Sequence, residues 1–291
     1  MKHRTILITG AAGRFGEPLA NELEKRHRIV RMDHRKPEEG FAASEDRRFI
    51  IGSITDPATI AEAIDGVDTV IHSAAVPSDQ LPFEKLVDTN VAGTFNMLEA
   101  AGQSASVEQF VFLSSLCWHG IGLGDPVLTR PQYLPIDEEH PSVAISPYGM
   151  SKVQGELWCQ AYAKRFGKPV VAVRPGWIVP PYYEGSLPPR PPRKTPWLMD
   201  HIATRDLIDG IERILDYDPP DGFDAFLFSA DDQMSTMPSV ELAEYYFPGI
   251  AMRKELLEAC DGYGSLIHTT HARERLGWEP RFRCNRNGET T

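Results

Sequence analysis

A tyrosine and a lysine four residues apart are the clearest candidates for acid–base chemistry in this sequence. Tyr148 and Lys152 open a segment with helical patterning that runs to about Phe166. Spacing i,i+4 places two side chains on one face of a helix. A free tyrosine has a pKa of about 10, and a neighbouring ammonium favours the phenolate. The pair is therefore predicted to supply a general base near neutral pH.

A serine at the end of an expected strand adds a third polar group. Ser115 follows the apolar run at 109–113. Open α/β sheets bind ligands at the carboxyl ends of their strands, so this hydroxyl is predicted to hold the reacting hydroxyl or carbonyl of a substrate. Taken alone, a Tyr-x-x-x-Lys spacing is more typical of a solvated helix pair. Together with the serine and a glycine-rich turn, it becomes specific.

The glycine-rich turn occupies residues 9–16, which read Thr-Gly-Ala-Ala-Gly-Arg-Phe-Gly. A strand is expected before it at 5–8 and a helix after it at 15–26. Such a turn suits a dinucleotide pyrophosphate, because glycines let the backbone approach and the helix start attracts phosphates. The spacing is GxxGxxG rather than GxGxxG, and a tight turn without a ligand is the alternative interpretation.

An acidic residue stands where a dinucleotide site needs one. Asp33 ends the second expected strand, 33 − 10 = 23 residues after Gly10. An acid about 20 residues on accepts hydrogen bonds from the adenosine ribose and repels a 2′-phosphate, which favours NAD over NADP. Arg35 follows closely and partly opposes that preference. The alternative is a solvated acid at a strand end.

The elements that must position these residues alternate between β-rich runs and helical periodicity. This alternation predicts an α/β fold: a doubly wound, Rossmann-type parallel sheet with a small C-terminal substrate-binding region. We expect an NAD-binding domain at 1–175, to which 201–230 return. The substrate-binding region then covers 176–200 and 231–281, and 282–291 form a frayed tail. Further strands are expected at 28–32, 48–51, 67–72, 109–113, 170–173 and 225–228, and helices from 83, from 148 and at 206–215.

Composition narrows the class of protein. The chain has 291 residues, of which 42% are hydrophobic and 24% charged, as in ordinary globular proteins. A net charge of −11 disfavours nucleic acid as a partner. There is no apolar run of about 18 residues for a membrane span and no secretory signal. Four scattered cysteines without a CxxC pair predict free thiols and a cytoplasmic location. Lone histidines such as His119 and His201 form no spaced cluster, so no metal site is predicted.

These motifs together resemble the extended short-chain dehydrogenase/reductases, the family that holds NAD-dependent sugar epimerases and dehydratases. The resemblance covers almost the whole chain. It rests on the TGxxGxxG turn, His72-Ser73-Ala74-Ala75, Asn90 in Asn90-Val91-Ala92-Gly93-Thr94, Ser114-Ser115, the Tyr148 and Lys152 pair, and Leu276-Gly277-Trp278-Glu279-Pro280.

The resemblance implies a mechanism and a cofactor. Tyr148 is then the general base and Ser115 orients the substrate oxygen, while Lys152 lowers the tyrosine pKa and binds the nicotinamide ribose. Asn90 has a role either in this chemistry or as a buried structural amide. A homodimer formed through the helices that carry Tyr148 and Asn90 is also implied. The implied NAD contacts are Gly10, Gly13, Arg14, Phe15, Gly16, Asp33, Ser53, Ile54, Ala74, Ala75, Asn90, Tyr148, Lys152 and Pro175.

Departures from the family pattern indicate which members this chain is most similar to. Dehydratases carry an Asp-Glu pair after the catalytic serine or threonine, where this chain has Leu116-Cys117, so elimination would lack its acid. Nucleotide-sugar epimerases carry an asparagine after the sixth strand, where this chain has Arg174-Pro175-Gly176-Trp177. The small uronate and aldose dehydrogenases resemble it best. By that resemblance the substrate contacts are Ser78, Ser115, Trp177 and a loop arginine, either Arg190 or Arg193.

Three functions remain open at this point. The first is an NAD-dependent oxidoreductase that oxidises a hydroxyl of a sugar, sugar acid or related polyol. The second is a nucleotide-sugar 4-epimerase with tightly bound NAD. The third is a cofactor-binding regulatory protein without turnover, which the intact serine, tyrosine and lysine disfavour. For the loop residues, a solvated arginine and ordinary aromatic packing at Tyr182, Tyr183 and Trp197 are the alternatives to a substrate role.

Overall fold

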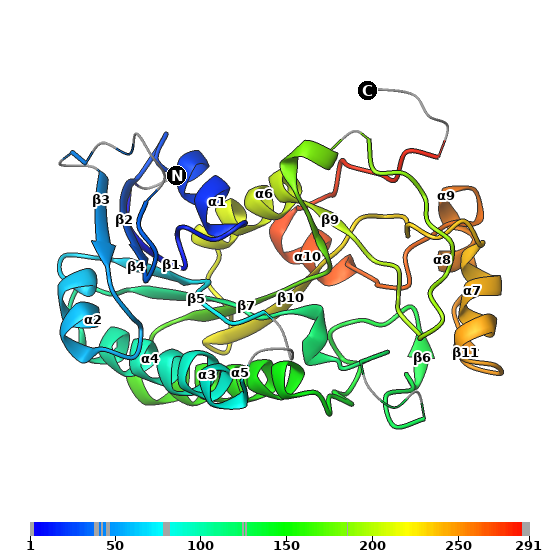
Figure 1. Cartoon of the computed structure of the whole chain (residues 1–291), viewed down its shortest axis with the longest axis horizontal. Helices are drawn as coiled ribbons and strands as arrows, with labels where there is room; N and C mark the ends of the chain where they lie inside the picture. Colours follow the sequence, from blue (N-terminus) through cyan, green and yellow to red (C-terminus); the bar gives the residue numbers. More distant parts are fainter. Residues whose placement is uncertain are drawn as a thin grey trace. The chain divides into compact units, whose positions relative to one another are not determined.

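The computed structural model describes residues 3–37, 41, 43–44, 47–77, 82–123, 125, 127–184 and 186–286 (Figure 1). The chain divides into two compact units. Unit 1 comprises Met1–Ser114, Met150–Val173 and Ile211–Ala225, and unit 2 comprises Ser115–Gly149, Arg174–Gly210 and Phe226–Thr291. The expected domain limits differ from this division chiefly at 115–149, which lie in unit 2. The division into compact units does not show which unit binds a ligand, so the NAD-binding domain stays a prediction.

A seven-stranded sheet is the central element, with strand order β10-β7-β5-β4-β1-β2-β3. Neighbouring strands from β7 to β3 pair in parallel (Figure 1). The order reverses direction along the chain at β1, which pairs with β2 on one side and β4 on the other. The expected doubly wound α/β sheet is therefore confirmed. Its strands are β1 Thr5–Thr9, β2 Arg28–Asp33, β3 Arg47–Ile51, β4 Thr69–His72, β5 Gln109–Leu113, β7 Val170–Pro175 and β10 Phe223–Phe228.

The central strands of unit 1 are apolar on both faces, because helices cover a parallel sheet from both sides. Leu7, Val70, Phe110 and Ala172 are all fully buried in one core with residues of the helices. Asp56 caps α2 by accepting a hydrogen bond from the Ala58 amide. The long helices are α1 Gly16–Leu23, α2 Pro57–Ile64, α4 Thr94–Gln103, α5 Pro147–Phe166 and α6 Thr204–Leu215.

Unit 2 is built mostly from short elements around a second core. Leu134, Met234, Leu242 and Leu266 are completely buried there. Two small parallel sheets join β6 to β11 and β8 to β9. The elements are η2 Leu116–Trp118, β6 Tyr133–Leu134, β8 Ile178–Val179, η3 Pro181–Tyr183, β9 Ile202–Ala203, α7 Ser239–Tyr246, β11 Ala251–Met252, α8 Lys254–Leu257, α9 Ala259–Gly262 and α10 Thr270–Leu276.

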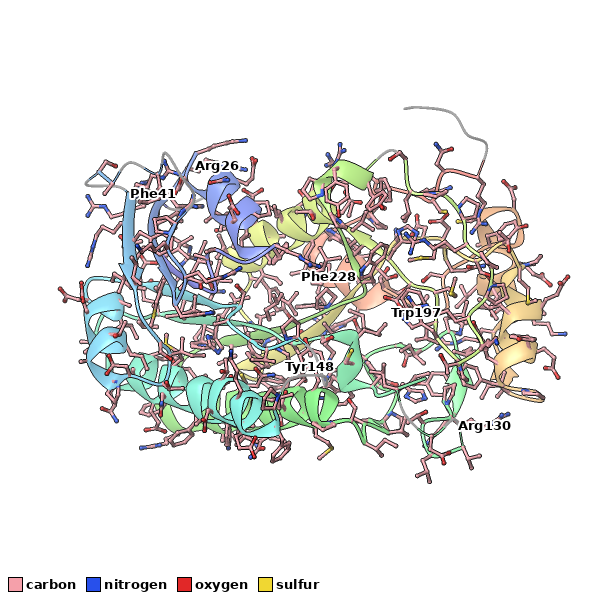
Figure 2. All side chains as sticks on the ribbon, in the orientation of Figure 1. Arg26, Phe41, Arg130, Tyr148, Trp197 and Phe228 are labelled. Atoms are coloured by element: carbon pink, nitrogen blue, oxygen red, sulfur yellow. The ribbon has the colours of Figure 1, made fainter. Side chains whose placement is uncertain are left out.

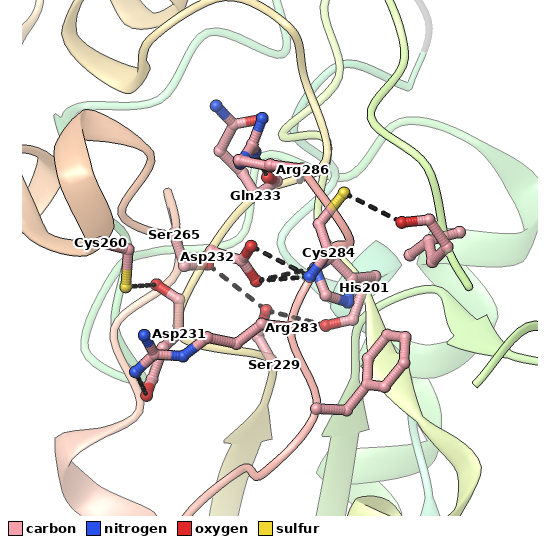
Figure 3. Close-up of polar contacts among 12 residues, drawn as sticks. His201, Ser229, Asp231, Asp232, Gln233, Cys260, Ser265, Arg283, Cys284 and Arg286 are labelled. Carbon is pink, nitrogen blue, oxygen red and sulfur yellow. Dashed lines mark hydrogen bonds and ion pairs between the residues drawn. The ribbon is translucent and has the colours of Figure 1, made fainter. Parts of the chain in front are cut away.

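The expected frayed tail is wrong for residues 282–286. Phe282 and Cys284 are buried, with 8% and 7% of their surface exposed. The Phe282 amide donates to Asp206 at 2.9 Å. The Cys284 amide donates to Asp232 at 3.0 Å, as Figure 3 shows. These buried carboxylates hold the segment, and polar composition alone gave no sign of such partners. The remaining residues, 287–291, lie outside the described part of the chain.

Candidate active site

The glycine-rich turn leaves no room for side chains at its three glycine positions. Gly10 has φ +71°, and a Cβ atom there would lie 2.8 Å from the Ala74 nitrogen. A Cβ at Gly13 or Gly16 would lie 2.9 Å or 2.1 Å from the Gly10 carbonyl oxygen. The turn therefore presents bare backbone directly before α1, as a pyrophosphate site requires.

Asp33 stands beside this turn at the end of β2. Its carboxylate is 5% exposed and accepts hydrogen bonds from the Ala12 amide at 3.0 Å and the Arg35 amide at 2.9 Å. The Arg35 guanidinium is 3.4 Å from the same carboxylate. A hollow of about 170 Å³ next to the turn is lined by Ala11, Ala12, Glu17, Arg31, Arg35, Lys36, Pro37, Phe41 and Phe49. The acid predicted to hold the adenosine ribose is thus fixed against the turn, and the residues present fit a dinucleotide.

A buried histidine supports the turn from β4. The Ala74 amide donates to the Thr9 hydroxyl at 3.2 Å, and that hydroxyl is 2.8 Å from His72 Nδ1. His72 Nε2 is 3.1 Å from the Thr94 hydroxyl. Burial, helped by the charge of Lys152, lowers the pKa of His72 to about 3. The imidazole is therefore neutral at physiological pH and bridges two threonines.

Asn90 lies in a π-helical segment, η1 Val87–Gly93, between α3 Phe83–Leu86 and α4. Its side chain is 3% exposed, accepts from the Val76 amide at 2.7 Å and donates to the Val76 carbonyl at 3.1 Å. It also donates to the Ser151 hydroxyl at 3.1 Å, on the helix that carries Lys152. Such bulges recur at functional sites. The Asn90 side chain therefore links the loop after β4 to α5. The apolar periodicity of the segment around Asn90 gave no indication of this link.

The other implied cofactor contacts are spread over the strand ends. Ile54 is buried and fills the space above Gly93, where a Cβ atom would lie 2.5 Å from Ile54 Cδ1. The Ser53 hydroxyl is 2.7 Å from the Thr55 hydroxyl. The remaining members differ in exposure: Phe15 and Pro175 are buried, Ala75 is half-buried and Arg14 is exposed.

Lys152 is fixed within unit 1. Its side chain is buried, Nζ donates to the Leu113 carbonyl at 2.7 Å, and Nζ lies 5.0 Å from the centre of the Phe112 ring. Tyr148 lies on the first turn of the same helix, α5 (Figure 2). The expected i,i+4 arrangement of this pair on one helix is therefore present. The ammonium is directed to the end of β5, the strand after which Ser115 follows.

Ser115 and Tyr148 belong to unit 2, where a glycine brings their segments together. Ser115 accepts a hydrogen bond from the Cys117 amide at 3.1 Å and so caps η2. A Cβ atom at Gly149 would lie 2.7 Å from the Cys117 carbonyl oxygen. Only a glycine next to Tyr148 lets the first turn of α5 approach the Ser115 turn this closely.

The loop residues expected at the substrate gather around two tryptophans of unit 2. The Arg190 guanidinium lies 5.4 Å from the centre of the Trp177 ring, and that of Arg193 lies 4.1 Å from the Trp197 ring. Trp177 is half-buried, while Tyr182 is 76% exposed. Ser78, the remaining expected substrate contact, lies outside the described residues.

One buried acid near these residues escaped the sequence reasoning. Asp200 is 1% exposed and accepts a hydrogen bond from the Trp177 amide at 2.6 Å. Burial raises the pKa of its carboxyl, and the charge of Arg193 acts in the opposite direction. No motif surrounds Asp200, so nothing in the sequence indicated it. Among the described residues, no group of three or more His, Cys, Asp and Glu side chains is arranged to hold a metal ion.

A parallel sheet with a bare-backbone turn after β1 and an acid after β2 defines a dinucleotide-binding α/β enzyme. The chain belongs to the NAD dependent epimerase/dehydratase family, whose model matches residues 6–216. The expected family and NAD as its cofactor are therefore confirmed. None of the helices described here is long and apolar enough to cross a membrane.

The relatives include sugar dehydrogenases and epimerases. The chain is 33% identical over 180 residues to an L-arabinose 1-dehydrogenase (NAD(P)(+)) of Haloferax volcanii, covering 60% of this chain and 67% of that protein. It is 30% identical over 208 residues to a uronate dehydrogenase of Pseudomonas putida, covering 72% and 70%. The solved UDP-glucuronic acid 4-epimerase from Bacillus cereus in complex with NAD has the same fold, with TM-score 0.67, 21% identity and coverage of 95% and 93%.

Proposed function

We propose that this protein is an NAD-dependent dehydrogenase that oxidises a hydroxyl of a sugar, sugar acid or related polyol. The observation that carries the proposal is the fixed ammonium of Lys152, one helical turn from Tyr148 and bonded to the carbonyl at the end of β5. A helix pair exposed to solvent would leave the lysine in water. A buried lysine aimed at a strand end instead serves a ligand or a neighbouring phenol.

Each of the three polar side chains has a role in proton transfer or positioning. The positive charge of Lys152 stabilises the phenolate form of Tyr148 before each turnover, and this phenolate takes the proton of the substrate hydroxyl. Ser115 donates a hydrogen bond to the same substrate oxygen and keeps it facing the tyrosine. NAD bound at this site would supply the acceptor for the hydride of the carbinol carbon.

Unit 1 supplies the residues that hold the cofactor in this proposal. Amides of the glycine-rich turn bind the pyrophosphate, and Asp33 accepts hydrogen bonds from the adenosine ribose. Lys152 also donates to the nicotinamide ribose. Asn90 keeps the backbone at Val76 in place and therefore acts as a positioning residue. Arg190 or Arg193, Trp177 and Ser78 complete the proposed substrate side.

The test combines a substrate panel with one conservative replacement. Purified protein with NAD is mixed with free aldoses, uronates and polyols, and NADH is followed at 340 nm. We expect NADH formation with at least one sugar class. Tyr148→Phe should lower kcat by roughly 100- to 10,000-fold, because it removes only the acid–base group. NAD affinity should stay within about threefold, since the ring and the helix remain.

A different result would favour another member of the family. No NADH on the panel, together with interconversion of UDP-sugars in a coupled assay, would replace the dehydrogenase by the 4-epimerase. Unchanged biological activity in Tyr148→Phe would instead support a regulatory protein that binds NAD without turnover.

We further infer that the protein pairs into a homodimer in the cytoplasm. Four large apolar side chains on α3, α4 and α5 are exposed: Phe83 (62%), Phe95 (44%), Met150 (49%) and Leu157 (58%). Apolar side chains gathered on neighbouring helices are typical of an interface. All four cysteines carry free thiols, which supports a reducing compartment. Sedimentation velocity of the purified protein measures the pairing.

A further inference from the structure

A buried carboxylate lies one helical turn beyond Lys152 on α5. Glu156 is 1% exposed and Lys152 is 4% exposed, so two side chains of opposite charge are removed from water on one helix face. Both charges act on the thiol of Cys159, farther along the helix. Burial raises the pKa of this thiol, the charge of Glu156 raises it further, and that of Lys152 lowers it. A glutamate is almost never buried so fully unless it is paired, and the proton transfer proposed above makes no use of this one.

Glu156 is bonded to a serine at the end of β5. The Ser114 hydroxyl donates to Glu156 Oε1 at 2.6 Å, and Ser114 is itself only 3% exposed. Hydrogen bonds to a carboxylate are shorter and stronger than those between neutral groups, and a buried position strengthens them further. The serine is therefore fixed to the helix that carries Lys152.

The peptide unit between Leu113 and Ser114 is the partner of the lysine. Lys152 Nζ donates to the Leu113 carbonyl at 2.7 Å. The other end of this peptide unit is the Ser114 amide, which donates to the Phe112 carbonyl at 3.0 Å. A peptide unit is planar, so the direction of its carbonyl is set by the position of the residue that follows. Because Glu156 fixes Ser114, it also fixes the carbonyl that directs the ammonium.

A glycine between the two charged residues brings α5 onto β5. A Cβ atom at Gly155 would lie 2.5 Å from Cζ of Phe112, and Lys152 Nζ lies 5.0 Å from the centre of the same ring. A larger residue at this position would push the helix away from the strand. The close approach therefore allows two short hydrogen bonds between helix and strand, one from Lys152 and one to Glu156.

We propose that Glu156 is a positioning residue: it holds Ser114 and, through the peptide unit before that serine, directs the Lys152 ammonium. All residues of this arrangement belong to unit 1. Only its catalytic consequence rests on the proposed dehydrogenase function, in which Lys152 stabilises the Tyr148 phenolate and binds the nicotinamide ribose.

The experiment measures directly whether Lys152 is held. The purified protein is treated with formaldehyde and cyanoborohydride, and the methylation of each lysine is followed by peptide mass spectrometry. Glu156→Ala should raise the methylation rate of Lys152 at least about tenfold, because the ammonium spends more time away from its carbonyl partner. Glu156→Gln keeps an oxygen that accepts from Ser114, so its rate should stay within about threefold of the wild type.

Ser114→Ala removes the same hydrogen bond from its donor side and leaves the Glu156 carboxyl in place. It should release Lys152 to the same extent as Glu156→Ala does. The double variant should exceed neither single variant by more than about twofold, because both replacements act on one bond.

A second lysine serves as the internal reference. Lys168 Nζ donates to the Ala101 and Ser104 carbonyls at 3.0 Å and 2.6 Å, so backbone in unit 1 holds this ammonium as well. Its methylation rate should be the same in all variants. Glu99→Ala is the matched surface control, because it removes a glutamate that is paired with Arg165 of α5. Every lysine of this control should react as in the wild type.

Kinetics separate the inference from the proposed function. With a substrate from the panel, Glu156→Ala should lower kcat about tenfold and keep KM within about threefold, since the buried Glu156 is not exposed to a substrate. A released Lys152 in a protein that forms no NADH supports the positioning and overturns the dehydrogenase. Unchanged Lys152 methylation in both alanine variants overturns the positioning, even if NADH is formed. A parallel rise at Lys168 also overturns it, because the loss is then one of general stability.

Discussion

The glycine-rich turn and the segment around Asp200 are constructed in opposite ways. In the turn, Gly10, Gly13 and Gly16 have no side chains, and the space that their Cβ atoms would fill is occupied by backbone. Around Asp200, a charged side chain is buried and one of its oxygens lacks a partner among the residues described. The first region is suited to a dinucleotide, whereas the second fixes a buried acid through hydrogen bonds within unit 2.

This difference explains why the turn could be predicted from the sequence and the environment of Asp200 could not. The backbone of the turn can approach neighbouring backbone and a pyrophosphate closely only where glycines stand at fixed spacing. This requirement therefore produces a motif of residues that are close together in the sequence. The Asp200 environment joins residues 176–177, 200–202 and 230, which are distant along the chain. Each of these residues is of a type that loops use everywhere, and only the fold brings them together.

The largest effect is expected from Gly16→Ala. The new Cβ atom would lie 2.1 Å from the Gly10 carbonyl oxygen, and backbone cannot give way as a flexible side chain can. Overpacking of this kind costs about 3 kcal/mol, which corresponds to about a 100-fold rise in the Kd for NAD. Calorimetric titration with NAD measures this change.

Gly66→Ala provides the control within the same unit. Gly66 has φ +72°, but nothing lies within 4 Å of its Cβ position. This replacement should cost roughly 1 kcal/mol of stability through backbone strain while the Kd for NAD stays the same. If Gly16→Ala bound NAD as tightly as Gly66→Ala does, the turn would not be the pyrophosphate site.

The fold and half of the site were predictable for physical reasons. Apolar runs bounded by turn residues located the parallel strands, and the strand expected at 109–113 has those bounds in the structure. Local spacing located the Gly10 turn, Asp33 and the Tyr148 pair. The π-helical segment around Asn90, the burial of 282–286 and the burial of Asp200 depend on hydrogen bonds between distant segments, and periodicity carries no information about these.

The next largest effect is a fall in the free energy of unfolding at acidic pH, caused by His72, the histidine that supports the turn. The pKa of His72 is about 3 in the folded protein because the ring is buried, against 6.5 in the unfolded chain. Between these values the unfolded state binds the additional proton, so the free energy of unfolding falls as pH falls. The loss is about 1.4 kcal/mol per pH unit, or about 2 kcal/mol from pH 6.5 to pH 5.

Urea unfolding at pH 7.5 and pH 5.0 measures this dependence, with His72→Asn as the comparison. Asparagine does not titrate, so the variant should lose about 2 kcal/mol less than the wild type between the two pH values. An equal loss in both proteins would contradict a neutral His72. The carboxyl of Asp200 affects stability with the opposite pH dependence. Burial raises its pKa, so its contribution to the free energy of unfolding falls as pH rises.

The smallest effect, and the one that joins the two regions, is expected from Gly176→Ala. The new Cβ atom would meet Asp200 Oδ2, the end of a side chain, and not backbone. The carboxylate therefore shifts and weakens its bond to the Trp177 amide, which should lower the free energy of unfolding by about 1 kcal/mol, as measured by urea unfolding. The Kd for NAD should not change, because Gly176 lies outside the turn. A weaker NAD complex with unchanged stability would instead place this glycine at the cofactor and remove the distinction between the two regions.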